Sequence, residues 1–265
     1  MAELIRAAGS TTLRDLREAT LGGQWRVLYQ PVVDLRTRRC VGAEALLRWR
    51  HPSRGLLLPS QFIELAESSG EIIAITRSVI RMVMRDLRWL GERGRDVYIG
   101  INLVAEHFLG PRIVTDLLAA AHSRAVNTTR LLLEITERGH VDPNAQMPLA
   151  VMNRLREHGF MLAIDDFGAH EGGMTYLAHF PVSHIKLDKA LVDSIAAGAK
   201  PRRALRGLVA TAQGLGVEVV AEGVETEAQA AFLACCGVRC GQGYAFARPM
   251  ACDDFDVFIA GSPLG

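Results

Sequence analysis

The chain has 265 residues, of which 49% are hydrophobic, 22% charged and 6% aromatic. This composition excludes a collagen-like, a disordered and a disulfide-scaffold protein, and the length allows a single large barrel of strands and helices. The net charge of +1 provides no overall field to hold a nucleic-acid polymer or an anionic membrane, so we expect neither as a partner.

The chain carries no sign of membrane insertion or secretion. No apolar run approaches the roughly 20 residues of a membrane helix, and the first residues lack the apolar core of a signal peptide. We therefore expect a cytoplasmic protein. Five cysteines form an odd set without repeated CxxC pairs, which favours reduced thiols over disulfides and over a soft metal site.

The predicted elements begin with an added N-terminal segment. Residues 1–23 contain a helical pattern at Leu13 and Leu16 and a break at Gly22 and Gly23, so we interpret them as a helix and linker. In a longer parent protein, this segment would continue from an upstream sensor or regulatory domain. We assign residues 24–262 to the main domain.

Short apolar runs alternate with amphipathic stretches along the main domain. Apolar residues repeat every three or four positions near 62–66, 75–83, 113–121, 147–155 and 205–212, which predicts helices. Another helix is expected from a capping box at Thr226 and Gln229 to Gly237. Eight strands are predicted, at 26–33, 42–49, 97–104, 131–135, 161–165, 184–187, 218–221 and 241–246.

Eight strands alternating with helices predict an α/β fold that closes as a TIM (β/α)8 barrel. The first two strands depart from this pattern. Only residues 35–40, a polar stretch, separate them, and so few residues cannot form a parallel crossover. We therefore predict a modified TIM barrel with an antiparallel first strand.

Polar residues recur near the ends of these apolar strands, where barrel active sites collect. Four neighbouring strands each supply an oxygen ligand, from Glu44, Asn102, Glu134 and Asp165. Carboxylate and amide oxygens without Cys or His suit Mg²⁺ or Mn²⁺ better than zinc or copper. Asp166 directly follows Asp165, so one of the two carboxylates could bridge two ions while the other serves the second ion.

The remaining strands add Lys186, Glu222 and Gln242, and Arg48 offers a planar fork for a phosphate. Two ions about 4 Å apart clamp both oxygens of an in-line phosphoryl displacement, so phosphodiester hydrolysis is the leading reaction. Taken singly, these residues have simpler explanations, because Lys186 could be a salt-bridge partner and Asp188 a helix cap. The joint pattern on consecutive strands favours an active site.

The run Glu44-Ala45-Leu46, followed by Leu47-Arg48-Trp49, resembles the name-giving motif of the EAL-domain family, the bacterial phosphodiesterases of cyclic di-GMP. The resemblance covers about residues 24–258. It implies a modified barrel that holds two Mg²⁺ or Mn²⁺ ions, hydrolyses cyclic di-GMP to linear pGpG and works as a homodimer. The further motifs in family order are Tyr29-Gln30-Pro31, Asn102-Leu103, Glu134-Ile135-Thr136-Glu137, Asp165-Asp166-Phe167-Gly168, Lys186-Leu187-Asp188, Glu222-Gly223-Val224-Glu225 and Gln242-Gly243-Tyr244.

The resemblance also implies a role for each matching residue. Lys186 would orient water and Glu222 would act as general base. Glu137 would anchor the loop that follows Asp166. The metal ligands would be Glu44, Asn102, Glu134, Asp165 and Asp166, and the contacts to substrate or water would come from Gln30, Arg48, Pro59, Asp166, Glu225 and Gln242.

One segment departs from the family pattern. Residues 169–173 read Ala-His-Glu-Gly-Gly, where the family usually has hydroxyl residues that Glu137 anchors. The departure motivates an alternative function, a cyclic di-GMP receptor that binds without useful turnover. A third interpretation is a metal-dependent barrel that acts on an unrelated small acid. It explains the presence of Arg48 and Gln242 less well.

Overall fold

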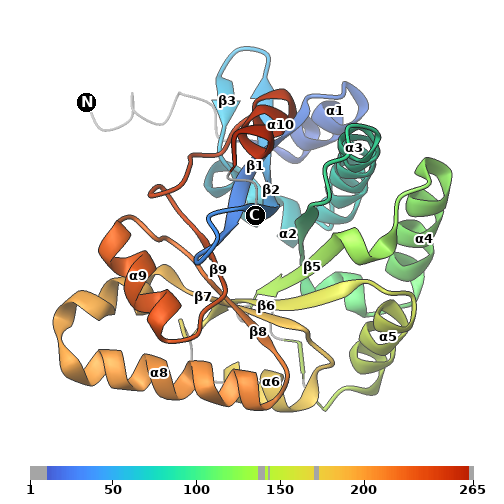
Figure 1. The fold of residues 1–265 in the computed structure, drawn as a ribbon. Helices are drawn as coiled ribbons and strands as arrows, with labels where there is room; N and C mark the ends of the chain where they lie inside the picture. Colours follow the sequence, from blue (N-terminus) through green and yellow to red (C-terminus); the bar gives the residue numbers. More distant parts are fainter. Residues whose placement is uncertain (1–10, 137–140, 143, 170–172, 263–265) are drawn as a thin grey trace, which may run out of the picture.

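The strands of this computed structural model close into a barrel that helices surround (Figure 1). The structure describes residues 11–136, 141–142, 144–169 and 173–262. The strands are β1 (Trp25–Asp34), β2 (Cys40–His51), β3 (Gly55–Leu57), β4 (Tyr98–Leu103), β5 (Leu131–Thr136), β6 (Met161–Phe167), β7 (His184–Leu187), β8 (Glu218–Ala221) and β9 (Cys240–Gln242).

Ten α-helices are described along the same residues, and short 3-10 turns link several of them to the strands. The helices are α1 (Leu13–Leu21), α2 (Ile63–Ser68), α3 (Ile72–Glu92), α4 (Arg112–Arg124), α5 (Gln146–Glu157), α6 (Gly173–His179), α7 (Lys189–Asp193), α8 (Ala199–Gly214), α9 (Glu227–Cys235) and α10 (Cys252–Gly261). None of the helices in the described ranges combines the length and the apolar character needed to cross a membrane.

The first strand runs against both of its neighbours, which confirms the modified barrel. β1 pairs antiparallel with β2 and with β9, whereas the successive pairs from β2 through β4 to β9 are parallel. A tight turn joins β1 to β2. Within it, the Asp34 carboxylate accepts hydrogen bonds from the backbone N–H groups of Arg36 and Thr37, and Arg38 adopts a φ of 61°.

One predicted strand is too long. The predicted strand at 241–246 ends at Gln242, because the next residues form a turn that packs against Val224. In this turn, the N–H of Phe246 donates to the carbonyl of Gly243, and the N–H of Ala245 donates to the carbonyl of Val224. The short β3 was not predicted; it extends β2 through a hairpin at Gly55, which adopts a φ of 74°.

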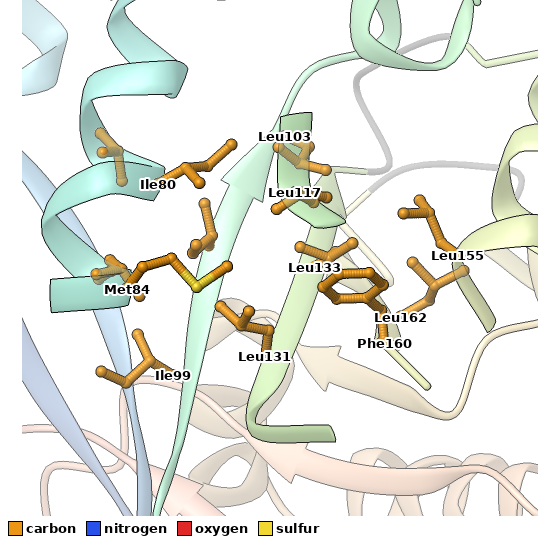
Figure 2. Packing of buried hydrophobic residues seen from close by; sticks show 14 of the residues in the cluster. Ile80, Met84, Ile99, Leu103, Leu117, Leu131, Leu133, Leu155, Phe160 and Leu162 are labelled. Carbon is orange, nitrogen blue, oxygen red and sulfur yellow. The ribbon is translucent and has the colours of Figure 1, made fainter. Parts of the chain in front are cut away.

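The hydrophobic core lies between the barrel wall and the helices outside it. Figure 2 shows Ile80 and Met84 of α3 facing Ile99 and Leu103 of β4, with Leu133 of β5 beside them. Burial of each such side chain contributes about 1.5–3 kcal/mol. The same packing therefore holds the outer faces of the strands in place.

The inner faces of the strands are different, because successive strand residues point to opposite sides. On β4 and β5, Ile101 and Leu133 belong to the outer core, so Asn102 and Glu134 face the barrel interior. The apolar strands therefore each carry an inward polar residue. The C-terminal ends of β4 to β8 gather these residues at one mouth of the barrel.

Candidate active site

A buried lysine lies at the centre of the barrel mouth. Lys186 comes from β7 and is 1% exposed. Its Nζ atom lies 3.3 Å from Glu44 of β2, 2.8 Å from Glu134 of β5, 3.0 Å from Asp165 of β6 and 2.7 Å from Glu222, which follows β8. One ammonium group thus faces four carboxylates drawn from four different parts of the barrel.

Burial, and after it the repulsion between neighbouring carboxylates, changes the pKa values in this cluster. Burial raises the pKa of Glu134 well above its ordinary value and that of Glu222 to about 8, and the attraction of Lys186 only partly opposes the effect. Burial raises the pKa of Asp165 as well. The single Lys186 ammonium therefore offsets only part of the cost of burying these carboxylates as anions.

Glu44 behaves differently from the other carboxylates. Burial would raise its pKa, but Lys186 and the amides of Gln242 and Asn102 together lower it. Asn102 Nδ2 donates to Glu44 Oε1 at 2.8 Å, and Gln242 Nε2 donates to Glu44 Oε2 at 2.8 Å. Gln242 Nε2 also donates to Gln30 Oε1 at 3.0 Å. The antiparallel register of β1 and β2 sets Gln30 opposite Glu44.

The geometry suits bound cations. Carboxylate oxygens of Glu44, Glu134 and Asp165 lie within 4.8 Å of one another, and so do those of Asp165, Asp166 and Glu222. Asp165 Oδ1 is buried, and within the described residues its one polar partner is the Lys186 ammonium, 3.0 Å away. Oxygen donors, unbalanced negative charge and a shared Asp165 fit hard divalent cations.

A backbone irregularity brings two consecutive aspartates to the same site. In a regular strand Asp165 and Asp166 would point to opposite faces. The register between β6 and β7 shifts between Ile164 and Phe167, and Asp166 adopts a φ of 54°, a conformation that is uncommon outside glycine. The Asp165 carboxylate therefore stays inside the barrel, and the bulge turns the Asp166 carboxylate toward Glu222 beside it.

A pocket of about 380 Å³ opens beside the cluster. The sequence prediction named most of its polar lining, but it singled out neither Lys189 nor Tyr244. Lys189 Nζ lies 2.8 Å from Glu225 Oε1, and Asp188 caps α7 by accepting the N–H of Ala190. The pocket is lined by Gln30, Glu44, Asp166, Asp188, Lys189, Glu222, Gly223, Glu225, Gln242, Gly243 and Tyr244.

Arg48 and Pro59 are not among the residues that line this pocket. Arg48 is half-buried, and its Nη1 donates to the carbonyl of Leu47 at 2.8 Å. Burial lowers the pKa of Arg48, an effect that the negative charge of Glu44 and the phenol of Tyr244 oppose. Pro59 begins a 3-10 turn and lines a second, mostly apolar pocket of about 240 Å³ that includes Asn102. The position predicted for Glu137 lies outside the described residues, as do residues 170–172 of the divergent loop.

Comparison with known proteins agrees with this geometry. Residues 13–249 match the family model described as the EAL domain. MucR of Pseudomonas aeruginosa, a bifunctional diguanylate cyclase/cyclic di-GMP phosphodiesterase, is 34% identical over 249 residues, which are 94% of this chain and 36% of MucR. The probable cyclic di-GMP phosphodiesterase PdeG of Escherichia coli is also 34% identical over 249 residues, 94% of this chain and 49% of PdeG.

The fold has a solved counterpart as well. The structure of the PaMucR phosphodiesterase in its c-di-GMP complex superposes with a TM-score of 0.84 at 35% identity and covers 92% of this chain and 98% of that one. The chain spans between about a third and a half of the length of MucR and PdeG. The match over nearly the whole barrel confirms the resemblance first seen in the motif at Glu44: the chain belongs to the EAL-domain family.

Proposed function

We propose that this chain hydrolyses cyclic di-GMP to linear pGpG. The observation that carries the proposal is the buried cluster in which Glu44, Glu134 and Asp165 converge at the mouth of the barrel, with Asp165 shared between two groups of carboxylates. The phosphodiesterase names of the 34% identical relatives and the cyclic di-GMP complex of the structural counterpart indicate the substrate.

The cluster would hold two Mg²⁺ or Mn²⁺ ions. Glu44, Asn102, Glu134 and Asp165 would bind one ion, and Asp165 and Asp166 the other. Bound there, the ions would activate the attacking water and neutralise charge on the phosphate oxygens. Burial and the neighbouring carboxylates raise the pKa of Glu134, so cations bound among these oxygens would stabilise its charged form, which is an electrostatic reason for binding them.

The other residues of the site would act on water and substrate. Lys186 Nζ, held by four carboxylates, would orient the attacking water. Glu222 lies 2.7 Å from Lys186 Nζ and would accept the proton of that water. Arg48 would bind a phosphate through its guanidinium, and Gln30 the adjoining sugar-phosphate. Gln242 would keep Glu44 oriented through its 2.8 Å hydrogen bond. Pro59 would contact substrate from the second pocket.

Four broader expectations remain proposals. Residues 1–23 would form an N-terminal segment distinct from the barrel of 24–262, Glu137 would anchor the loop after Asp166, the working unit would be a homodimer, and the chain would act in the cytoplasm. An upstream sensor or regulatory domain would fit relatives that are two to three times longer than the matched region. Light scattering of the purified chain tests the dimer directly.

The test is a product assay with cyclic di-GMP and Mg²⁺ or Mn²⁺, read by ion-exchange chromatography. Wild type is expected to yield linear pGpG, and Glu44→Ala and Asp165→Asn are expected to lose at least about a hundredfold in rate through loss of a metal ligand. Leu215→Ala, at an exposed position after α8, serves as the control. If the protein binds cyclic di-GMP tightly but leaves it intact, the chain is a receptor and not an enzyme. Full turnover by Glu44→Ala would refute the two-ion site.

A further inference from the structure

A further cavity lies outside the barrel, in the layer of helices next to β4. It has a volume of about 220 Å³ and opens between α3 and α4, which pack against each other (Figure 1). The 3-10 turn η3 (Ala105–Phe108), which follows β4, forms another wall. No residue of the carboxylate cluster around Lys186 lines this space. We call it the α3/α4 cavity.

The walls of the α3/α4 cavity are mostly apolar. Ile73 and Ile80 of α3 and Ile113 of α4 line it, and Ile80 and Ile113 are buried. In another protein, an apolar cavity of about 150 Å³ holds benzene. The α3/α4 cavity therefore has room for a small ring or a branched chain together with one polar group.

A buried imidazole in the lining offers a hydrogen bond that no atom of the described residues accepts. His107 of η3 is 6% exposed, and its Nε2 atom has no partner there. Its Nδ1 atom accepts the backbone N–H of Val104 at 3.1 Å. Burial lowers the pKa of His107, so the ring is neutral at pH 7 and carries its proton on Nε2. A buried donor without an acceptor destabilises the chain, and a ligand that accepts from Nε2 would relieve this.

The N-terminal end of α4 adds a second attraction, for negative charge. α4 begins at Arg112, and Gly110, Arg112 and Ile113 all line the cavity. The N-cap residue, Pro111, makes no side-chain hydrogen bond to the helix, and the first turn contains no acidic residue. The first N–H groups of a helix carry partial positive charge, which a nearby anion stabilises.

The charged side chains of the lining do not oppose this preference. Arg77 Nε donates to Asp116 Oδ2 at 2.8 Å, so these two charges compensate each other. Arg112 and Glu106 are exposed to solvent and have opposite signs. Because the formal charges of the four side chains cancel, the His107 donor and the end of α4 decide which ligand is favoured.

We infer that the α3/α4 cavity binds a small carboxylate anion with an apolar body. The carboxylate accepts the Nε2–H of His107 beside the N-terminal end of α4, and the apolar body lies among the isoleucines. A phosphate, which carries more charge to be satisfied, fits a mostly apolar lining less well. The inference goes beyond the proposed phosphodiesterase activity and does not depend on it.

The probe for the test is benzoate, titrated in EDTA and without cyclic di-GMP so that metal ions and substrate play no part. Nitrogen NMR of the histidine rings reports binding, and the Nε2 signal of His107 is identified by its loss in His107→Gln. We expect this signal to shift in wild type below about 20 mM benzoate. Benzylamine, which has the same ring with a positive charge, and acetate, which lacks the ring, should each bind at least about tenfold more weakly.

Two substitutions separate the Nε2 donor from the rest of the imidazole. The amide of His107→Asn can replace Nδ1 and accept the Val104 N–H, but it is too short to donate from the position of Nε2. The amide nitrogen of His107→Gln reaches that position. In calorimetric titration we expect benzoate affinity to fall at least about tenfold in His107→Asn and to stay within about threefold of wild type in His107→Gln. Lys200→Met, at an exposed position of α8, is the control and should bind as wild type does.

The wild-type titration decides the inference even if a variant fails to fold. An unchanged His107 ring signal at about 20 mM benzoate would overturn it, and so would equal affinities for benzoate and benzylamine. Wild-type affinity in a folded His107→Asn would show that the Nε2 donor does not hold the ligand. Since the titrations contain neither metal nor substrate, their outcome is independent of whether the chain hydrolyses cyclic di-GMP.

Discussion

Removal of the Lys186 ammonium is the sharpest test of how the carboxylate cluster is held together. Lys186→Met keeps the length of the side chain and deletes its charge. The ammonium is 2.7–3.3 Å from Glu44, Glu134, Asp165 and Glu222, which would then share a buried site without a counterion. Removal of one partner from a buried ion pair typically costs about 3–5 kcal/mol.

The loss of stability should depend on pH and on divalent ions. In EDTA at pH 8, we expect the free energy of unfolding of Lys186→Met to fall by about 3–5 kcal/mol relative to wild type. At lower pH the loss should shrink, because the carboxylates with raised pKa values take up protons. Saturating Mg²⁺ should recover part of the loss, because ions that bind the folded state stabilise it.

The assay is urea unfolding followed by circular dichroism, with and without EDTA. Lys200→Met is the control, since it removes an exposed lysine that makes no ion pair within the described residues. A surface change of this kind should stay within about 0.5 kcal/mol. An equal unfolding midpoint for Lys186→Met and wild type in EDTA at pH 8 would show that Lys186 does not hold the cluster.

Three further predictions concern the same region. In EDTA, the stability of wild type should fall as the pH rises from about 7.5 to 8.5, because burial raises the pKa of Glu222 to about 8, and folded protein keeps a proton that the unfolded chain has released. Saturating Mg²⁺ should flatten this slope in urea titrations. Gln242→Ala should weaken Mn²⁺ binding about 10- to 100-fold in calorimetry, since it removes the 2.8 Å donor that orients Glu44. Gly243→Ala should lower both the unfolding midpoint and the rate of pGpG release, because its Cβ would meet the Val224 carbonyl at 2.1 Å.

Each of these three predictions can be contradicted by a specific measurement. The pH range begins about one unit above the ordinary pKa of histidine, so the histidines of the unfolded chain have mostly released their protons there. Burial lowers the pKa of His107 and His184 in the folded chain, so these two side chains are neutral in both states across the range. A flat or rising stability across the range would therefore contradict the electrostatics of the cluster. Unchanged Mn²⁺ affinity in Gln242→Ala would remove its orienting role. Wild-type stability in Gly243→Ala would show that the turn adjusts without cost.

The sequence by itself determined the barrel and most of the polar set at its mouth. The repeat of apolar residues is a local property, so it predicted β7 and β8 at the residues where they occur, 184–187 and 218–221. The short link between the first two strands excluded a parallel crossover, and antiparallel pairing followed. An inward Glu44 on an apolar strand required compensation by charge, which indicated a site.

Tertiary structure decided how those residues act together. The bulge that turns Asp166 toward Glu222 depends on pairing between β6 and β7, which no local pattern records. Lys186 serves as counterion to four carboxylates only because separate strands converge in space. The turn that ends β9 and presents Tyr244 exists because Gly243 packs against Val224, a contact that closes between residues distant along the chain. Local periodicity fixes which face of a strand is polar, whereas contacts between distant segments fix where each polar atom points.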